Sequence, residues 1–154
     1  MKRLVLIVMC VMLGAGALSA QRLVAVGRYV TPTMNVKWLS DSPTLGGKAL
    51  LLEFFHSANS DCRSRVEEVN DLAYTYNNIL DVVVVAREPV EQVASILLHD
   101  YQNAYVGIDE QGALFGQMEV PHVPYAILLS PRGEVLWLGN PTKLTTATLD
   151  KLLK

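Results

Sequence analysis

The sequence predicts one α/β domain with a mixed central β-sheet and helices on its faces. Two segments, 49–55 and 81–86, are apolar almost throughout, as expected for central strands that are buried on both faces. Strands of this kind need helices to cover them. The segment between them predicts such a helix, because apolar side chains recur there every three or four residues. The residues of this stripe are Cys62, Val66, Val69, Ala73 and Tyr76.

The second half of the chain continues the pattern. Pro89 lies in a first helical turn, and the apolar residues behind it predict a second amphipathic helix. These residues are Val90, Val93, Ala94, Leu97 and Tyr101. Two apolar runs, 125–129 and 134–138, are separated by the sequence SPRG, which predicts a tight turn between antiparallel strands. A last helix is expected after Thr145 or Thr146, and its buried face comprises Leu149, Leu152 and Leu153.

The first 20 residues have the design of a secretory signal peptide. Lys2 and Arg3 precede an apolar run at 4–13, and small residues follow up to Ala20. The apolar run is too short to span a bilayer. We therefore expect export, cleavage near Ala20 and a location in the periplasm or outside the cell, without stable membrane insertion after cleavage.

Removal of residues 1–20 leaves about 130 residues, which is enough for one compact domain and too few for two. We expect an N-terminal extension at 21–47, with a possible strand at 22–29 and a short one at 36–39, and then the folded domain at 48–154. Cleavage removes two of the 13 basic residues and none of the 15 acidic ones, so the mature chain is acidic and no nucleic-acid partner is expected. Cys62 is then its only cysteine, which excludes an internal disulfide.

The stretch at 51–63, LLEFFHSANSDCR, resembles the active site of thioredoxin-like proteins. In that family an acidic residue and two aromatic residues precede a Cys-x-x-Cys motif at the start of a helix. Residues 53–55, Glu-Phe-Phe, match the first part. Asn59 then falls at the position of the attacking cysteine, and Cys62 at that of the resolving cysteine. The motif is thus NSDC in place of Cys-x-x-Cys.

A second match lies at 120–137, VPHVPYAILLSPRGEVLW. In the family a Val-Pro or similar pair precedes the hairpin, and its proline is cis and faces the cysteine motif. Val123 and Pro124 match this pair. Together the two stretches resemble the bacterial envelope branch, which includes TlpA-like and redoxin-type proteins, over roughly residues 36–154. The resemblance implies a thioredoxin-like fold with a helical insertion before the cis-proline loop.

The departure at Asn59 limits the chemistry. A dithiol oxidoreductase needs one thiolate to attack a disulfide and a second thiol to resolve the mixed disulfide. Asn59 has no sulfur, so this site cannot cycle as a dithiol, and we favour a role for Asn59 as helix N-cap. Cys62 lies in the first helical turn and also opens the apolar stripe. A reactive thiol and a small core side chain are therefore both open interpretations.

Further candidate residues lie around the motif. Glu53 matches the family's buried acid, and the resemblance implies that it takes the proton from the resolving thiol. A carboxylate in an apolar strand should also have a raised proton affinity or find a partner. The residues expected to line a partner-binding groove are His56, Asn59, Ser60, Asp61, His122, Val123 and Pro124. The spacing of the two histidines and Cys62 does not require a metal, so neither a metal nor a cofactor is expected. Loop histidines are usually solvated, and pH-dependent partner binding is favoured over a metal site.

A peroxidase of the peroxiredoxin type is disfavoured. Peroxiredoxins share the fold and keep a threonine or serine, after a proline, three residues before the attacking cysteine. Here that position is Asn59, and no proline lies between Phe55 and Cys62.

Two functions remain open. In the first, which we favour slightly, the chain is an exported thiol–disulfide redox protein with an altered site, in which Cys62 alone forms mixed disulfides with a partner protein or a small thiol. In the second, the chain is a redox-inactive module that binds an extended peptide or partner protein in the groove beside NSDC and Pro124. The sequence does not decide whether the chain is an enzyme, and it leaves the oligomeric state open.

Overall fold

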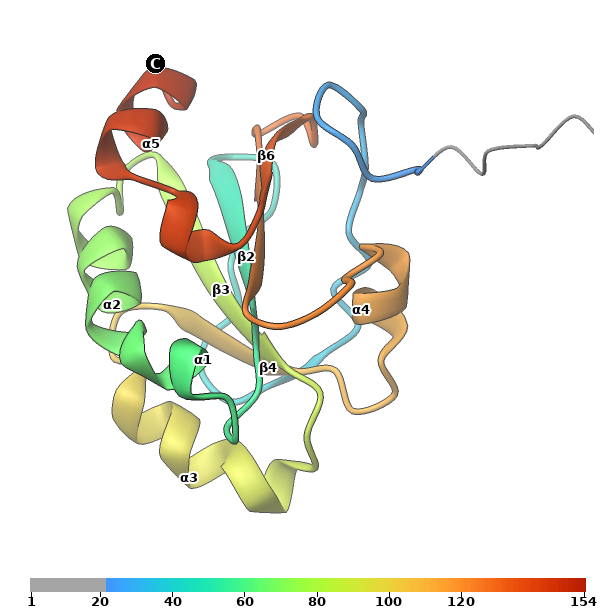
Figure 1. The fold of residues 1–154 in the computed structure, drawn as a ribbon, viewed down its shortest axis with the longest axis vertical. Helices are drawn as coiled ribbons and strands as arrows, with labels where there is room; N and C mark the ends of the chain where they lie inside the picture. Colours follow the sequence, from blue (N-terminus) through green and yellow to red (C-terminus); the bar gives the residue numbers. More distant parts are fainter. Residues whose placement is uncertain (1–21) are drawn as a thin grey trace, which may run out of the picture.

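The computed structural model describes residues 22–154, so the predicted signal peptide lies outside the described residues. Within this range the chain forms a six-stranded mixed sheet with the order β1-β4-β3-β2-β5-β6 (Figure 1). The strands are β1 (Lys37–Trp38), β2 (Ala49–Phe55), β3 (Leu80–Ala86), β4 (Tyr105–Ile108), β5 (Tyr125–Leu129) and β6 (Val135–Gly139). β2, β3 and β4 are parallel, whereas β1, β5 and β6 run antiparallel to their neighbours.

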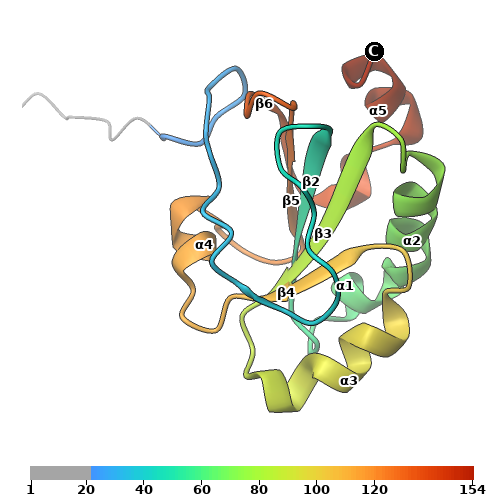
Figure 2. The same ribbon diagram turned by 180° about the vertical axis from the view of Figure 1, so that it is seen from behind.

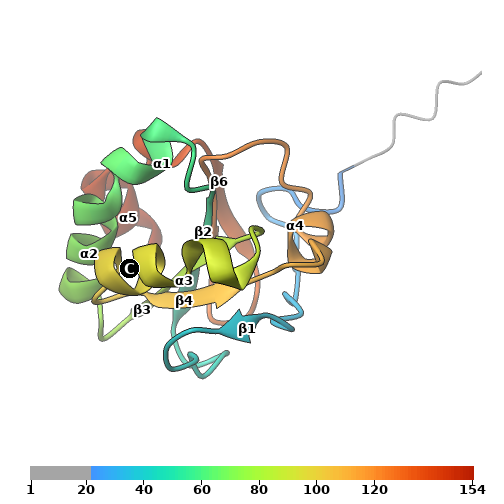
Figure 3. The same cartoon turned by 90° about the horizontal axis from the view of Figure 1, so that it is seen from below.

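Helices cover both faces of this sheet. They are α1 (Ser60–Ser64), α2 (Val66–Thr75), α3 (Val90–Asp100), α4 (Ala113–Gln117) and α5 (Thr146–Leu152), with a 3₁₀ turn, η1 (Pro141–Lys143), before the last helix. Seen from below, α1, α2, α3 and α5 lie on one side of the sheet, and α4 lies on the other together with the N-terminal segment (Figure 3). The fold is therefore three-layered, as the sequence predicts.

The side chains on the two faces of β2 belong to two separate hydrophobic clusters. Leu51 and Phe55 point toward the helices α1, α2, α3 and α5, and Leu52 and Phe54 point toward α4, because side chains alternate along a strand. All seven residues of β2 and all seven of β3 are buried. Complete burial of each apolar side chain contributes about 1.5–3 kcal/mol to the free energy of unfolding. The carboxyl ends of these strands therefore hold the loops that follow them in fixed positions.

The N-terminal strap, residues 22–36, covers the α4 side of the sheet (Figure 2). Side chains from the end of α4 hold it in place. Gln117 Oε1 accepts a hydrogen bond from Thr33 N at 2.7 Å, and Glu119 Oε2 accepts one from Val24 N at 3.1 Å. The strap thus packs against the sheet, although only Tyr29 in the predicted strand 22–29 makes an isolated bridge, with Glu134.

The structure differs from the sequence-based expectation in three further places. The helix expected from 59 to 76 is divided at Arg65, which ends α1 and precedes α2. Strand β4 and helix α4 were not predicted, because four and five residues are too few for a clear periodicity. Gly107 also weakens the β4 pattern. A Cβ there would lie 2.6 Å from Val36 Cγ2, so any other residue would force the Val36 side chain to shift. The segment before the proline loop therefore contains a strand as well as helices.

Candidate functional site

The candidate site lies where β2 ends. The loop 56–59 leads from β2 into α1, and β5 pairs with β2 in antiparallel register, with Phe54 opposite Tyr125. This pairing brings the loop before β5 to the start of α1. The Val123–Pro124 peptide bond is cis, which agrees with the sequence-based expectation.

Asn59 connects the two loops. Its Oδ1 accepts a hydrogen bond from Cys62 N at 3.0 Å, and its Nδ2 donates one to the Val123 carbonyl at 3.2 Å. The first bond satisfies a free N–H group at the helix start, so the predicted N-cap role is confirmed. The second places the proline loop directly against the NSDC motif.

Cys62 is a buried, free thiol in the first turn of α1. It is 4% exposed and belongs to the hydrophobic cluster below the helices. Burial raises the pKa of the Cys62 thiol above its usual value, and the nearby carboxylates of Glu53 and Asp61 add to this rise. A backbone hydrogen bond at His56 and the Arg65 cation oppose it. The thiol is therefore protonated at neutral pH, and its reactivity depends on exposure and on its charged neighbours.

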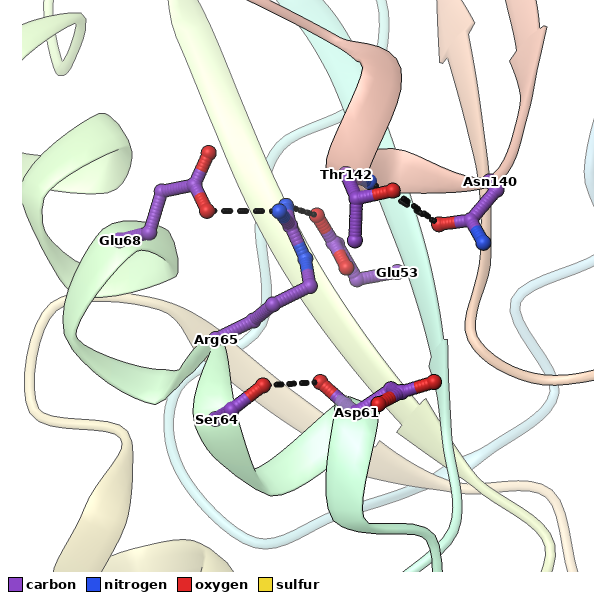
Figure 4. Close-up of polar contacts among 7 residues, drawn as sticks. All are labelled: Glu53, Asp61, Ser64, Arg65, Glu68, Asn140 and Thr142. Carbon is purple, nitrogen blue, oxygen red and sulfur yellow. Dashed lines mark hydrogen bonds and ion pairs between the residues drawn. The ribbon is translucent and has the colours of Figure 1, made fainter.

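Glu53 is paired with a buried arginine that the sequence reading missed (Figure 4). Arg65 is 4% exposed; its Nη2 lies 3.0 Å from Glu53 Oε1, and its Nη1 lies 2.6 Å from Glu68 Oε2. Arg65 Nε is buried and has no hydrogen-bond partner among the residues that the structure describes. Burial raises the pKa of Glu53, and the Arg65 cation opposes this rise. Glu53 therefore has the partner that a buried carboxylate requires.

A second buried carboxylate, Glu88, fixes the loop before Asn59. Ser57 donates two hydrogen bonds to it, one from its backbone N at 2.9 Å and one from its Oγ. His56 Nδ1 lies 3.6 Å from the same carboxylate and accepts a hydrogen bond from Ala58 N at 3.1 Å. Glu88 follows β3, so the two central strands together shape this loop. No sequence signal pointed to Glu88, because its partners, Ser57 and His56, lie in the loop that follows another strand.

The remaining predicted residues lie at the rim of the site. Ser60 and Asp61 are exposed in the first turn of α1, and His122 is exposed before the proline loop, with its ring 5.6 Å from that of Tyr125. His56 and His122 thus contact different partners. In residues 22–154 no three His, Cys, Asp or Glu side chains gather in a manner suited to a metal ion. A hollow of about 200 Å³ lies at the other end of β2, where Lys48, Leu50 and Asp81 line it.

Solved structures with the same fold include several thiol–disulfide proteins. A thiol-disulfide isomerase from Corynebacterium glutamicum superposes with a TM-score of 0.70 and 14% sequence identity, over 83% of this chain and 97% of that one. An exposed lipoprotein thioredoxin from Streptococcus pneumoniae superposes with a TM-score of 0.67 and 18% sequence identity, over 76% of this chain and 95% of that one. A secreted disulfide oxidoreductase from Mycobacterium tuberculosis superposes with a TM-score of 0.60 and 19% sequence identity, over 76% of this chain and 90% of that one.

These likenesses confirm the thioredoxin-like fold that the sequence predicts. A comparison with protein-family models and one with curated protein sequences find no match. No helix in residues 22–154 is long and apolar enough to cross a membrane.

Proposed function

We propose that the chain is an exported thioredoxin-like protein that takes part in thiol–disulfide exchange through one thiol, Cys62, which reacts slowly. One observation carries this proposal: the thiol lies in the first turn of α1, and the N-cap of that turn is bonded to the cis-proline loop. The structural neighbours include a thiol-disulfide isomerase, a thioredoxin and a disulfide oxidoreductase, which supports a redox role for this arrangement. One of these neighbours is a secreted protein and another is an exposed lipoprotein, which supports export.

The proposed reaction is a single exchange. The Cys62 thiol loses its proton to solvent, and its thiolate attacks one sulfur of a partner's disulfide. The sulfur–sulfur bond of the partner breaks, a mixed disulfide forms between Cys62 and the attacked sulfur, and the other sulfur leaves as a thiolate and takes up a proton. Because Asn59 has no sulfur, a second thiol from outside the chain must release the partner.

Burial makes this exchange slow. The thiol is 4% exposed and its pKa is raised, so a disulfide reaches it only when the start of α1 separates from the proline loop. The Asn59–Val123 hydrogen bond opposes that separation. We therefore expect stoichiometric capture of partners and no rapid turnover.

Trapping tests the proposal. Cells that express the wild-type chain are treated with a thiol-blocking reagent, and envelope proteins linked to the chain by disulfides are identified by mass spectrometry. The control is Cys62→Ser, which keeps the size of the side chain. Partners that are present with wild type and absent with Cys62→Ser support the exchange. Equal capture by both chains, or none by either, contradicts it.

The alternative, a redox-inactive binding module, is favoured by one specific contact. Asn59 donates to the carbonyl of Val123, which is the residue before the cis-proline, so the two loops are held together without any sulfur chemistry. In this reading Cys62 is a core side chain. Partner capture without disulfide bonds that persists in Cys62→Ser and is lost when Val123 is replaced by a bulky residue would favour the module.

A further inference from the structure

Three large apolar side chains of the N-terminal strap are exposed to solvent. Leu23, Val26 and Tyr29 are 77%, 64% and 67% exposed, whereas Val24 between them is buried. We call these three exposed residues the strap tip. Single apolar side chains are common on protein surfaces, but several within the short range 23–29 form a local apolar surface. Such a surface gains free energy when another apolar phase covers it.

The strap tip is fixed at one end of the molecule. Gly27 N donates to the Val135 carbonyl at 2.9 Å, which ties the strap to the start of β6. In the sheet, Val135 lies opposite Leu129, and Leu129 lies opposite Leu50 near the start of β2. Both ribbon views show the start of the strap beside the turn between β5 and β6 (Figures 1 and 2). The candidate site follows the other end of β2, so the two lie at opposite ends of the molecule.

The strap is cationic in a chain that is otherwise acidic. Arg22 and Arg28 are exposed next to residues of the strap tip, and all 15 acidic residues of the chain lie at or after Asp41. Arg132, in the turn beside the strap, is exposed as well. Segments that lie on anionic lipid combine exposed apolar side chains with arginine or lysine in this manner.

Two carboxylates also lie at the strap. Glu119 accepts hydrogen bonds from the N–H groups of Leu23 and Val24, at 3.4 and 3.1 Å, and Glu134 accepts one from the Tyr29 hydroxyl at 3.5 Å. These carboxylates hold the strap in place and reduce the positive charge of the three arginines without reversing it. The electrostatic attraction to an anionic surface is therefore modest, and burial of the apolar side chains must supply the rest of the binding energy.

A hollow of about 200 Å³ extends this surface toward the start of β2. Val30, Leu45 and Leu129 are among the residues that line it, and Leu45 is itself half exposed. Lys48 also lines the hollow, where it pairs with Asp81 at 3.2 Å. The same end of the molecule thus combines exposed apolar side chains, an apolar hollow and exposed cations.

We propose that the strap tip docks the protein on an anionic phospholipid surface, with its apolar side chains at the level of the headgroups and the three arginines near the lipid phosphates. The order of the chain agrees with this. The sequence predicts a signal peptide that ends at Ala20, so the strap leaves the membrane directly behind it during export. A docked protein keeps Cys62 at the end turned away from the bilayer. The proposal concerns where the protein lies and does not depend on the exchange proposed for Cys62.

Co-sedimentation with vesicles tests the proposal. Protein recovered from the envelope of expressing cells is mixed with vesicles of phosphatidylglycerol and phosphatidylcholine, or of phosphatidylcholine alone. We expect binding to the anionic vesicles, weaker binding to the neutral ones, and a decrease as salt rises. Leu23→Ser combined with Val26→Ser should lower the affinity about tenfold. Arg28→Gln should lower it about fivefold.

Two matched controls lie outside the strap. Tyr74→Ser, at a tyrosine of α2 that is 69% exposed, and Arg63→Gln, at an exposed arginine of α1, should leave the affinity unchanged. A spectroscopic measurement adds a second readout. The emission of Tyr29→Trp should shift to the blue when anionic vesicles are added, because the new indole enters the headgroup region, whereas that of Tyr74→Trp should not.

Several outcomes would overturn the proposal. It fails if the wild type does not bind anionic vesicles, if it binds neutral ones equally well, or if Tyr74→Ser weakens binding as much as the strap variants do. Binding through a retained signal peptide would leave the strap variants as tight as the wild type, which also contradicts the proposal. If the wild type instead forms a dimer that the strap variants dissociate, and does not bind vesicles, the strap tip joins two copies of the chain.

Discussion

Asn59 and Val123, which are 64 residues apart in the chain, are joined by a hydrogen bond from the Asn59 amide to the Val123 carbonyl at 3.2 Å. The same side chain caps α1 through its oxygen. One amide thus caps the helix and joins it to the proline loop, at the position where the sequence resemblance places the family's attacking cysteine.

The two contacts of Asn59 can be separated by substitution. Asn59→Ala removes both and should lower the free energy of unfolding by about 1–2 kcal/mol. Asn59→Ser keeps a capping oxygen and loses the donor to Val123, so its loss should be smaller. Urea unfolding measures both. Equal losses would show that the capping bond adds nothing to stability, and an unchanged Asn59→Ser variant would show the same for the contact with Val123.

Wild-type protein should not catalyse the reduction of insulin by dithiothreitol above background, because Asn59 supplies no attacking thiol. Asn59→Cys should raise the rate several-fold, since the new thiol sits at a helix start, where its anion is favoured, with Cys62 three residues later. The control is Asn59→Cys combined with Cys62→Ser, which should lose the gain. A folded Asn59→Cys variant that forms no disulfide with Cys62 would show that the two positions do not form a dithiol site.

Removal of the Glu88 carboxylate should loosen the loop before Asn59. Glu88→Ala leaves the backbone N and the hydroxyl of Ser57 without their acceptor and should cost about 1–3 kcal/mol of unfolding free energy. Glu91→Ala, an exposed change in the first turn of α3, should stay within about 0.5 kcal/mol of wild type. Similar losses in the two variants would mean that the bonds to Ser57 do not stabilise the fold.

Stability should decrease at alkaline pH. The pKa values of Cys62 and Tyr101 are raised in the folded protein by burial, so the unfolded chain releases these protons first, above the ordinary values of 9.0 and 10.0. The unfolded state then binds fewer protons than the folded state, and the free energy of unfolding falls as pH rises. Cys62→Ala and Tyr101→Phe should flatten this decline in urea unfolding. Tyr74→Phe, at an exposed tyrosine, should leave it unchanged.

Local sequence determined much of this protein. The apolar runs at 49–55 and 81–86 predicted central strands, and the place of Asn59 before an amphipathic stripe predicted a helix cap. The hairpin from β5 to β6 and the start of the last helix at Thr145 were predictable for the same reason, since turn and capping residues act on their immediate neighbours.

Tertiary structure alone decided the electrostatics of the site. The sequence pattern did not single out Arg65, which ends α1, is buried and pairs with Glu53 from β2. Glu88 joins the site only because β3 lies beside β2, and Val123 reaches Asn59 only because β5 pairs with the other edge of β2. Such contacts depend on how strands pair across the sheet, and periodicity along one segment carries no information about its partners. The sequence therefore determined most of the elements and the lack of a second cysteine, and the packing decided which charged residues lie in the core around the site.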